Sequence, residues 1–370
     1  MLTQVIVIFG GKSAEHEVSL KSAMTVINAM DRTYFQVVGI YITREGAWHN
    51  LGVIREPIAN VEQLMGQPAN GNVSSSIGNV LAEIFGTAEK NVVFPVMHGP
   101  NGEDGTLQGL LEMLNVPYVG NGVLASAAGM DKEMTKRVMK EAGIPQAPYV
   151  TFTSYEWERQ SALCCEATER QVGYPCYVKP ANMGSSIGIR RCGNRAEWEE
   201  AVEQAFRYDH KVVIEQEIPG REVQVAVLGN EEPIVSIAGE FVREPTFFHY
   251  AQKYLQGNLV QQIPAKVSNA VYDQIHKYAV RAFQALCGSG LMRVDFFVTD
   301  RDEVYFNEVN TLPGFTQNSM YPVLWNRTSG LTYPQLVQRL IRLALERHAQ
   351  KQLLHYELEA ELTEQGRRRA

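Results

Sequence analysis

Two apolar segments in the last third of the chain carry polar side chains at alternate positions. Arg293 and Asp295 are two residues apart in the first segment, and Glu308 and Asn310 are two apart in the second. Because successive side chains of a β-strand point to opposite faces, each pair would share one face of a hairpin closed by a turn at 300–302. Its carboxylate and amide oxygens are the ligands that Mg²⁺ prefers, and they leave room for phosphate. The alternative is a solvated face with a salt bridge, but most neighbouring residues are apolar, which favours a metal site.

A second chemical candidate is the glycine–serine segment at 177–189. A strand ending at Lys179 and Pro180 leads into Gly184, Ser185 and Ser186. Backbone N–H groups and hydroxyls in such a loop can wrap phosphate oxygens, while the lysine supplies a point charge. A plain β-hairpin with a lysine at its edge also fits these residues, and the neighbouring metal-type pairs favour phosphate binding.

Two carboxylates are candidates for holding a nucleoside. Glu215 ends an apolar strand, and Glu222 begins the next strand. They could accept hydrogen bonds from an exocyclic amine and from ribose hydroxyls, although each by itself also fits an ordinary surface residue.

Two further motifs are misleading. Gly11-Lys12-Ser13 resembles the end of a phosphate-binding P-loop, but the required first glycine is replaced by Ile6. Gly120-x-Gly122-x-x-Ala125, with Glu141 further on, has the form of a dinucleotide fingerprint. Only a short apolar stretch precedes it and no second nucleotide-binding half follows, so we reject a nicotinamide site.

The N-terminal part has the pattern of a mostly parallel sheet. Apolar strands are expected at 4–9, 36–43 and 91–97, with a helix beginning near Val18 and Ser13 as its cap. Ligands gather beyond the carboxyl ends of such strands, where Gly10-Gly11 and His98-Gly99 would lie. Residues 52–79 are rich in Gly, Asn, Ser and Pro, and are interpreted as a surface insertion.

The remainder indicates an α+β architecture. A helix at 131–142 ends at Gly143, and a closing helix is expected near 332–350. The tail from 351 is charged and is expected to fray. Short strands are expected at 148–152, 175–179, 187–190, 212–216, 223–227, 233–242, 292–298 and 303–309.

The bulk composition is typical of a cytoplasmic enzyme that acts on small molecules. At 370 residues the chain should form two or three domains, and its net charge of −7 gives no reason to expect a nucleic-acid partner, which normally needs a basic face. No stretch approaches the roughly 20 apolar residues of a membrane span, and the start lacks the features of a signal peptide. The five cysteines are odd in number and form no C-x-x-C pair, which indicates reduced thiols.

Taken together, these features resemble the ATP-grasp superfamily, and specifically the D-alanine–D-alanine ligase family. The resemblance covers nearly the whole chain apart from 52–79 and the tail. It rests on five segments: GGKSAEHEVSL (10–20), MHGPNGEDGTLQGLLE (97–112), GMDKEMTK (129–136), YVKPANMGSSIGI (177–189) and RVDFFVTDRDEVYFNEVNTLPGFTQNSMYP (293–322).

The resemblance implies an α/β three-domain ATP-grasp fold. The expected units are an N-terminal domain at 1–125, a central one at 126–213, a C-terminal one at 214–350 and a tail at 351–370, with ATP held between the last two domains. The implied reaction joins two D-alanine molecules through a D-alanyl phosphate, with ADP and phosphate as the other products, for peptidoglycan synthesis. A homodimer is also implied.

The resemblance assigns roles to individual residues. ATP would be held by Lys132, Lys179, Ser186, Glu215, Glu222 and Lys253. Two Mg²⁺ ions, with Mn²⁺ as a substitute, would be bound by Asp295, Glu308 and Asn310. The D-alanine molecules would be bound by Glu15, His98, Arg293, Gly314, Ser319 and Met320. Catalysis would involve Glu15, Ser185, Tyr254, Arg293 and Gly314.

The choice of second substrate depends mainly on Tyr254, which in the family pairs with Ser185 and Glu15. The Lys253-Tyr254 pair indicates the dipeptide product rather than D-alanine–D-lactate. The chain departs from the family at Phe248, where a tyrosine is expected, and at Met320, where leucine is common. Three alternatives stay open: a D-serine or D-lactate ligase on the same fold, another carboxylate–amine ligase, and an ATP-binding protein without catalysis.

Overall fold

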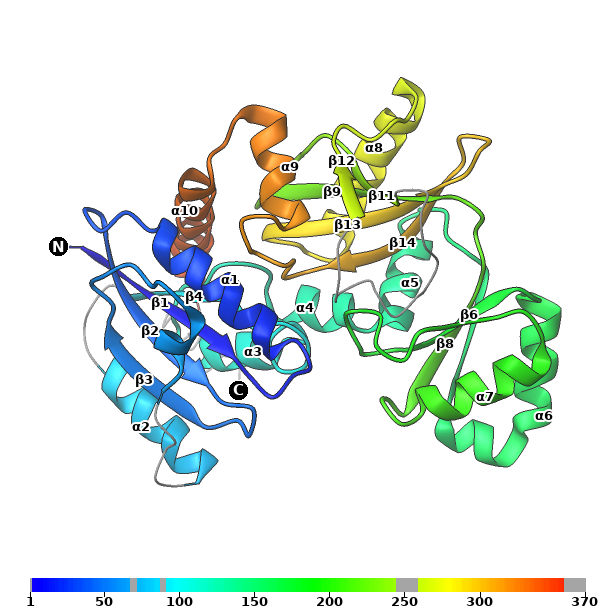
Figure 1. Ribbon diagram of the computed structural model, residues 1–370, viewed down its shortest axis with the longest axis horizontal. Coiled ribbons are helices and arrows are strands. Elements are labelled where there is room, and N and C mark those ends of the chain that lie inside the picture. The colour runs from blue at the N-terminus through cyan, green and yellow to red at the C-terminus, as the bar shows by residue number, and fades with distance from the viewer. Residues whose placement is uncertain (1, 67–71, 87–90, 244–258, 356–370) are drawn as a thin grey trace, which may run out of the picture.

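Three β-sheets, each with its own helices, make up the protein (Figure 1). The structure is a computed structural model, and it describes residues 2–66, 72–86, 91–243 and 259–355. Each sheet packs its apolar face against helices, as expected for layered α/β and α+β architectures.

The first sheet has the strand order β3-β2-β1-β4. β1 (Thr3–Gly10), β2 (Phe35–Ile42) and β4 (Asn91–Pro95) are parallel, and β3 (Trp48–Val53) is an antiparallel edge strand. Helices α1 (His16–Ala29), α2 (Val73–Phe85) and α3 (Thr106–Met113) belong to this part of the chain. β1 is fully buried from Val5 to Phe9, as the continuous β-branched run of a two-sided parallel strand requires. The expected parallel sheet is confirmed.

Two details of this unit differ from expectation. Helix α1 begins at His16, and Ser13 accepts a hydrogen bond from the backbone N–H of Glu15 at 3.0 Å instead of capping a helix at Val18. Within 52–79, η1 (Val61–Leu64) and the first half of α2 are helical, and Leu64 is fully buried. Helix α2 was not expected because serines and a glycine fill its first half, while most of its apolar residues lie near its end.

The second sheet is antiparallel, with the order β5-β8-β6-β7. Its strands are β5 (Tyr149–Thr153), β6 (Cys176–Pro180), β7 (Arg190–Cys192) and β8 (Lys211–Gln216). Helices α6 (Ser154–Gln171) and α7 (Arg195–Ala205) pack on it, and neither was expected from the sequence. Strand β8 runs past residue 213, so the expected boundary between the central and C-terminal units falls inside a strand.

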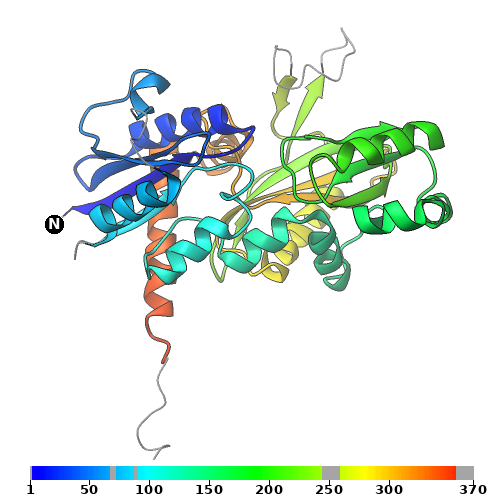
Figure 2. The ribbon, with the colours of Figure 1, turned by 90° about the horizontal axis from the view of Figure 1, so that it is seen from below.

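The third sheet is built around the long strands β9 (Arg221–Gly229), β13 (Gly290–Val298) and β14 (Val304–Asn310). The single strand expected at 233–242 is two strands, β10 (Ile234–Val235) and β11 (Gly239–Arg243), and β11 pairs with β12 (Leu259–Gln262). Helices α8 (Asn269–Ala285), α9 (Met320–Ser329) and α10 (Tyr333–Lys351) follow, and the last confirms the expected closing helix. Helix α10 extends away from the rest of the molecule in Figure 2.

Helices α4 (Val123–Met130) and α5 (Lys132–Glu141) lie between the first and second sheets (Figures 1 and 2). Asp131 caps α5, and the helix ends before Gly143, as expected. Although α5 falls in the range expected for the central unit, its Met139 is fully buried in the core of the third sheet.

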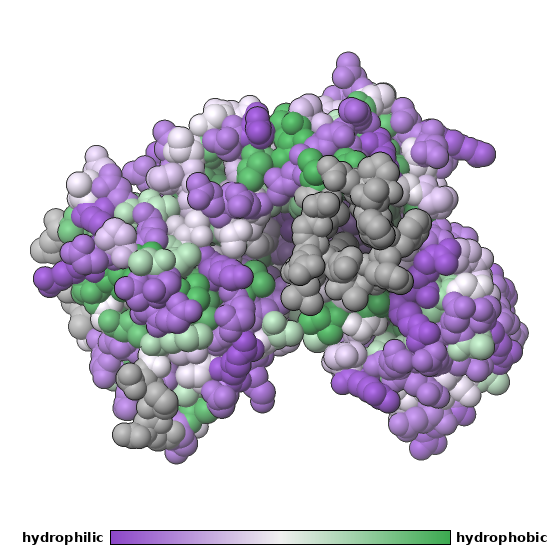
Figure 3. All heavy atoms as spheres, in the orientation of Figure 1, coloured by the Kyte–Doolittle hydropathy of each residue, from purple (hydrophilic) through white to green (hydrophobic). Residues whose placement is uncertain are grey.

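The space-filling view shows the second-sheet lobe set apart from the N-terminal lobe by an open notch with polar residues on both sides (Figure 3). In the described part of the chain no helix is both long and apolar enough to cross a membrane. All five cysteines are free thiols, and four of them are buried.

Candidate active site

The carboxyl edge of the first sheet brings together Glu15, His98 and Glu103. β1 and β4 are neighbours, so the segments that follow them meet at this edge, as expected. His98 Nδ1 lies 3.5 Å from Glu103 Oε1, and Glu103 Oε2 accepts a hydrogen bond from Gly99 N at 2.9 Å. Burial and the charge of Glu103 raise the pKa of Glu15, despite the opposing effects of Ser185 and His98. Burial lowers the pKa of His98, but the two carboxylates outweigh burial and raise it.

The glycine–serine loop closes onto this edge. The hydroxyl of Ser185 donates a hydrogen bond to Glu15 Oε1, which joins the second lobe to the first. A Cβ atom on Gly184 would lie 3.2 Å from Glu15 Oε2, so a side chain at this position would crowd the carboxylate. Ser185 and Ser186 both have left-handed φ angles, 51° and 58°, which are uncommon for serine and typical of functional loops.

Strands β13 and β14 place the three expected metal ligands together. In the register, Asp295 lies opposite Glu308 and Arg293 lies opposite Asn310. Arg293 Nε and Nη2 each donate to the carboxylate of Asp295 at 2.8 Å. The hairpin and its shared polar face are therefore confirmed.

Asp295 is fully buried at the centre of this face. Burial raises its pKa to about 6, although Arg293 opposes that shift. Gln224 Nε2 on β9 adds a hydrogen bond at 3.1 Å to Asp295 Oδ2. The buried carboxylate is thus only partly compensated by the groups around it.

A β-bulge in β14 adds Asn307 to the same face. Phe306 pairs with Phe296 and Glu308 with Asp295, so Asn307 is the extra residue. Its Oδ1 atom is buried and has no hydrogen-bond partner among the described residues. Sequence reasoning missed Asn307 because it assumed strict alternation; the buried positions Phe306 and Val309, three apart, were the available signal.

Three lysines converge from α5 and β6. Glu215 on β8 is 3.0 Å from Lys179 Nζ and 3.4 Å from Lys136 Nζ. Although burial opposes ionisation, these lysines lower the pKa of Glu215 to about 2. Lys132 Nζ donates to the carbonyl of Met183 at 2.5 Å, and burial lowers its pKa. Lys136 is a site residue that the sequence did not single out.

The other expected site residues are more scattered. Glu222 lies opposite Phe297, two residues along β9 from Gln224. A Cβ on Gly314 would lie 3.3 Å from Ser319 Oγ, so these two positions are adjacent. Met320 is 4% exposed in the core of the first sheet and α10, so any influence on substrate choice is indirect. Lys253, Tyr254 and the altered segment at 247–249 lie outside the described residues.

One cleft is lined by several of these groups. Its walls come from α5, the glycine–serine loop, the β14 strand and the segment after β4, and include Glu103, Lys132, Ser185, Ser186, Glu308 and Asn310. Cationic, hydroxyl and carboxylate groups that face one open space suit a phosphorylated ligand with a bound cation.

The rejected motifs have structural roles instead. Asn121 donates hydrogen bonds of 2.7 Å to the carbonyls of both Leu291 and Thr311, which joins the Gly120–Gly122 turn to the third sheet. A Cβ on Gly10 would lie 2.1 Å from the carbonyl of Ile42, so the turn after β1 requires glycine for close packing.

Comparison with known proteins decides the family. The family model for the D-ala D-ala ligase N-terminus matches residues 4–121, and the one for the C-terminus matches residues 138–342. The chain belongs to the D-alanine–D-alanine ligase family. It is 49% identical to the D-alanine–D-alanine ligase of Geobacillus kaustophilus over 366 residues, which cover 98% of this chain and 100% of the relative. It is 48% identical to that of Bacillus velezensis over 94% of this chain and 99% of the relative.

Solved structures of this ligase family share the architecture. The D-alanine–D-alanine ligase of Coxiella burnetii superimposes with a TM-score of 0.77 at 34% identity, covering 95% of this chain and 96% of that one. The VanG D-Ala:D-Ser ligase of Enterococcus faecalis gives 0.76 at 34% identity, covering 93% and 100%. The ATP-grasp fold expected from the sequence is confirmed, and the near-equal scores mean that the fold does not select the second substrate.

Proposed function

We propose that this member of the ligase family joins two D-alanine molecules into D-alanyl-D-alanine, with conversion of one ATP to ADP and phosphate. The observation that carries the proposal is the cleft lined by Lys132, Ser185 and Glu308. Glu15 adjoins it through its hydrogen bond with Ser185, and Asp295 through its pairing with Glu308. The N-terminal sheet supplies groups suited to an amino acid, and the other two sheets supply groups suited to ATP.

The first half-reaction transfers the γ-phosphoryl group of ATP to the carboxylate of one D-alanine. A carboxylate is a poor electrophile, and the resulting acyl phosphate has a good leaving group. Glu15 would bind the ammonium group of this D-alanine, beside His98 and Glu103. Arg293, half-buried and positively charged, would stabilise the negative charge that develops on the oxygens.

In the second half-reaction, the amine of another D-alanine, after losing a proton, attacks the acyl carbonyl. The tetrahedral intermediate then expels phosphate, and a peptide bond forms. Arg293 and the backbone at Gly314 would stabilise its oxyanion, while Ser319 would bind the second carboxylate. Thr316 N donates to Ser319 Oγ at 3.0 Å, which holds this hydroxyl beside Gly314.

The residues of the β13–β14 face fit divalent cations. Asp295 and Glu308 lie opposite each other, and Asp295 has a carboxylate whose charge its neighbours only partly compensate. Within the described residues no three His, Cys, Asp or Glu side chains could hold a metal, so the amide of Asn310 is needed as the third ligand. We propose two Mg²⁺ ions here, with Mn²⁺ as a substitute; bound to ATP, they would neutralise its phosphate charge.

For the nucleotide, we propose that Lys132, Lys179 and Ser186 contact phosphate oxygens and that Glu215 and Glu222 contact the adenine amine and the ribose. Lys179 is now engaged with Glu215, so ATP would compete for or share both side chains. Lys253 and Tyr254 are proposed to act from outside the described residues. A homodimer and a cytoplasmic location remain further proposals, as do the domain limits 1–125, 126–213 and 214–350.

The test is phosphate release from Mg²⁺-ATP with D-alanine, L-alanine or no amino acid, with the product identified by mass spectrometry. We expect release that depends on D-alanine, and D-alanyl-D-alanine as the product. Release only when D-serine or D-lactate is added would replace the proposed second substrate. ATP binding without any release would favour the non-catalytic alternative.

The metal assignment is tested by Glu308→Gln, which keeps the side-chain volume and removes the charge. We expect activity to fall at least about 100-fold while the circular-dichroism spectrum and melting temperature stay near those of the parent. Near-normal turnover in a folded variant would refute the assignment.

A further inference from the structure

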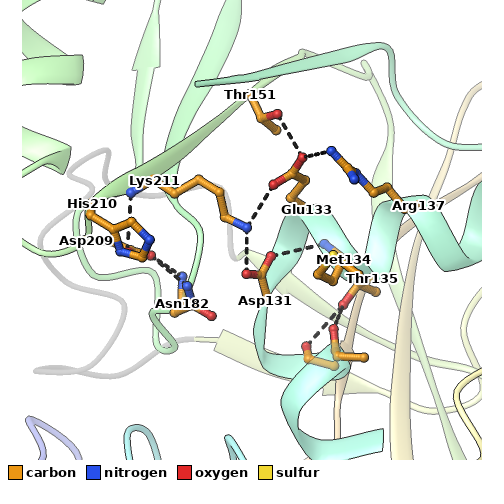
Figure 4. Close-up of polar contacts among 12 residues, drawn as sticks. Asp131, Glu133, Met134, Thr135, Arg137, Thr151, Asn182, Asp209, His210 and Lys211 are labelled. Carbon is orange, nitrogen blue, oxygen red and sulfur yellow. Dashed lines mark hydrogen bonds and ion pairs between the residues drawn. The ribbon is translucent and has the colours of Figure 1, made fainter. Parts of the chain in front are cut away.

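Lys211, on strand β8 of the second sheet, binds the two residues that flank Lys132. Its Nζ lies 2.7 Å from Asp131 Oδ2 and 2.8 Å from Glu133 Oε2, as Figure 4 shows. The three side chains are 15%, 15% and 10% exposed, so these ion pairs are largely withdrawn from solvent. Lys211 was not expected to act in the site.

Backbone hydrogen bonds run through the same point. The carbonyl of Lys211 accepts from Ala181 N, and the carbonyl of Ala181 accepts from Lys132 N, both at 3.0 Å. Lys132 Nζ then donates to the carbonyl of Met183, two residues further into the glycine–serine segment. Lys211 therefore contacts both the start of the phosphate-binding loop and the start of the helix that carries Lys132.

A neighbouring set of contacts fixes the first residue of that loop. Asp209 Oδ2 accepts hydrogen bonds from Asn182 N at 2.6 Å and from Asn182 Nδ2 at 3.1 Å (Figure 4). Glu133, besides Lys211, accepts from Thr151 Oγ1 of the second sheet at 3.1 Å. The polar contacts thus form one continuous layer between α5 and the second sheet.

The two sides of helix α5 pack against different sheets. Its apolar side, with Val138 and Met139, packs in the core of the third sheet. Its first turn contacts the second sheet through the polar groups described above, and Lys136 reaches Glu215 of the same sheet. Apolar packing is insensitive to small changes of charge, whereas ion pairs depend on the position and charge of each partner. Lys211 therefore bridges two separate hydrophobic cores.

We propose that Lys211 is a positioning residue for ATP binding: through Asp131 and Glu133 it holds Lys132 in register with the glycine–serine loop. This inference rests on the proposed role of Lys132 and the loop as phosphate-binding groups. Lys132 is on a helix that packs on the third sheet, whereas the loop follows a strand of the second sheet. Their relative placement must therefore be maintained before ATP binds. A pre-organised site loses less free energy on binding than one that must first be assembled.

The electrostatics agree with permanently charged partners. Burial lowers the pKa of Lys211, but its hydrogen bonds to Asp131 and Glu133 outweigh burial and raise it. Burial raises the pKa of Asp131, yet Lys211 and the N–H of Met134 together lower it. Burial likewise raises the pKa of Glu133, but Lys211 and Thr151 lower it overall, so all three groups stay ionised near neutral pH.

The experiment compares ATP binding and steady-state kinetics for the parent and for Lys211→Met, Lys211→Arg and Arg195→Met. Methionine keeps the length of the lysine stem and removes its charge. Arg195 on α7 forms an exposed ion pair with Glu199 in the same lobe, without contact to α5, and so provides a matched control. The Kd of Mg²⁺-ATP is measured without amino acid, so this readout does not depend on which amino acids are joined.

We expect Lys211→Met to raise the Kd and KM for ATP about tenfold, because a smaller fraction of molecules has an assembled site. The KM for D-alanine should change much less, by about twofold, since His98 and Arg293 lie outside this contact and Glu15 meets the loop through Ser185. Lys211→Arg should restore most of the ATP affinity, and Arg195→Met should resemble the parent. An unchanged ATP affinity in folded Lys211→Met, or an equal loss for ATP and D-alanine, would overturn the proposal.

Asp131→Asn provides a second route if Lys211→Met fails to fold. Asp131 also caps α5 by accepting from Met134 N at 3.0 Å, and asparagine is an equally good cap. This variant therefore removes the charge and keeps the helix start. A selective loss of ATP affinity would support the proposal, and parent-like affinity would reject it. D-alanine-dependent phosphate release by the parent enzyme separates failure of this inference from failure of the proposed function.

Discussion

At the scale of single residues, the site is dominated by charges that are buried and paired. Glu215 is 3% exposed and lies between Lys179 and Lys136. The contact with Lys179 is the shorter, and its 3.0 Å is within the usual hydrogen-bond range. Removing one partner from such a group is costly because the remaining charges stay buried without compensation.

Glu215 should make the free energy of unfolding depend on pH in the acid range. Its pKa in the folded protein is about 2, against the ordinary 4.5 of a glutamate side chain in the unfolded chain. Its stabilising effect is therefore fully present above about pH 4.5 and is lost as the pH falls toward 2. The unfolded chain binds more protons in this window, and the total effect is about 3 kcal/mol. Urea unfolding of the parent and Glu215→Gln between pH 5 and 3 checks this. The parent should lose stability more steeply, by about 1 kcal/mol per pH unit; parallel curves would contradict the assignment.

At the scale of elements, the bulge in β14 determines which side chains reach the cleft. Without the extra residue, Phe306, Glu308 and Asn310 would share a face; with it, Phe306 enters the core while Asn307, Glu308 and Asn310 are available to the site. Bulges are common where a strand must re-aim side chains next to a site. The cost here is a buried Asn307 oxygen that lacks a partner among the described residues.

This cost leads to a prediction for Asn307→Leu. An unsatisfied buried acceptor costs about 1–3 kcal/mol, so replacing it with an apolar side chain of similar size should leave the melting temperature unchanged or raise it. If ATP supplies the missing donor, the Kd for ATP should increase while the KM for D-alanine does not. Thermal melting and ATP titration of the same samples measure both effects. Lower stability together with normal ATP affinity would show that Asn307 has a structural partner instead.

At the scale of the whole molecule, the N-terminal unit and the C-terminal helices share one apolar core, and a few specific polar contacts add to this attachment. Arg347 on α10 donates to the carbonyls of Gly120 at 2.5 Å and Tyr118 at 3.1 Å. Its guanidinium also lies 4.3 Å from the centre of the Tyr118 ring. Since Glu15 and His98 come from the N-terminal sheet, these contacts help to set the amino-acid groups against the ATP groups.

Arg347→Met should therefore weaken the attachment of the N-terminal unit. Hydrogen bonds to a charged group and the cation–π contact are each worth about 1–2 kcal/mol, so we expect unfolding to require about 2–3 kcal/mol less free energy. Arg342→Met is the control, because Arg342 on the same helix forms an exposed pair with Glu346 and should change stability by under about 0.5 kcal/mol. Chemical denaturation measures both. Equal effects would mean that Arg347 does not join the two parts.

The sequence by itself determined the local chemistry of this protein. Alternation in β13 and β14 predicted that Asp295 and Glu308 share a face, and the parallel-sheet pattern predicted that Gly10-Gly11 and His98-Gly99 lie at one sheet edge. Both are confirmed because period-two alternation and parallel pairing are short-range rules that an apolar pattern reveals directly. Helices α6 and α7 were missed because their apolar residues are few and serve a small separate core.

Only the tertiary structure decided how the three sheets and their helices combine. Three features join residues that are far apart in the chain: the packing of α5 on the third sheet, the ion pairs of Lys211, and the contact of Lys136 with Glu215. The position of Asn307 depends on one extra residue in a strand. A charged residue in a sequence does not disclose its partner, because ion pairs impose no periodicity on the chain around them. Their geometry follows from packed cores, and it is there that separate motifs become one site.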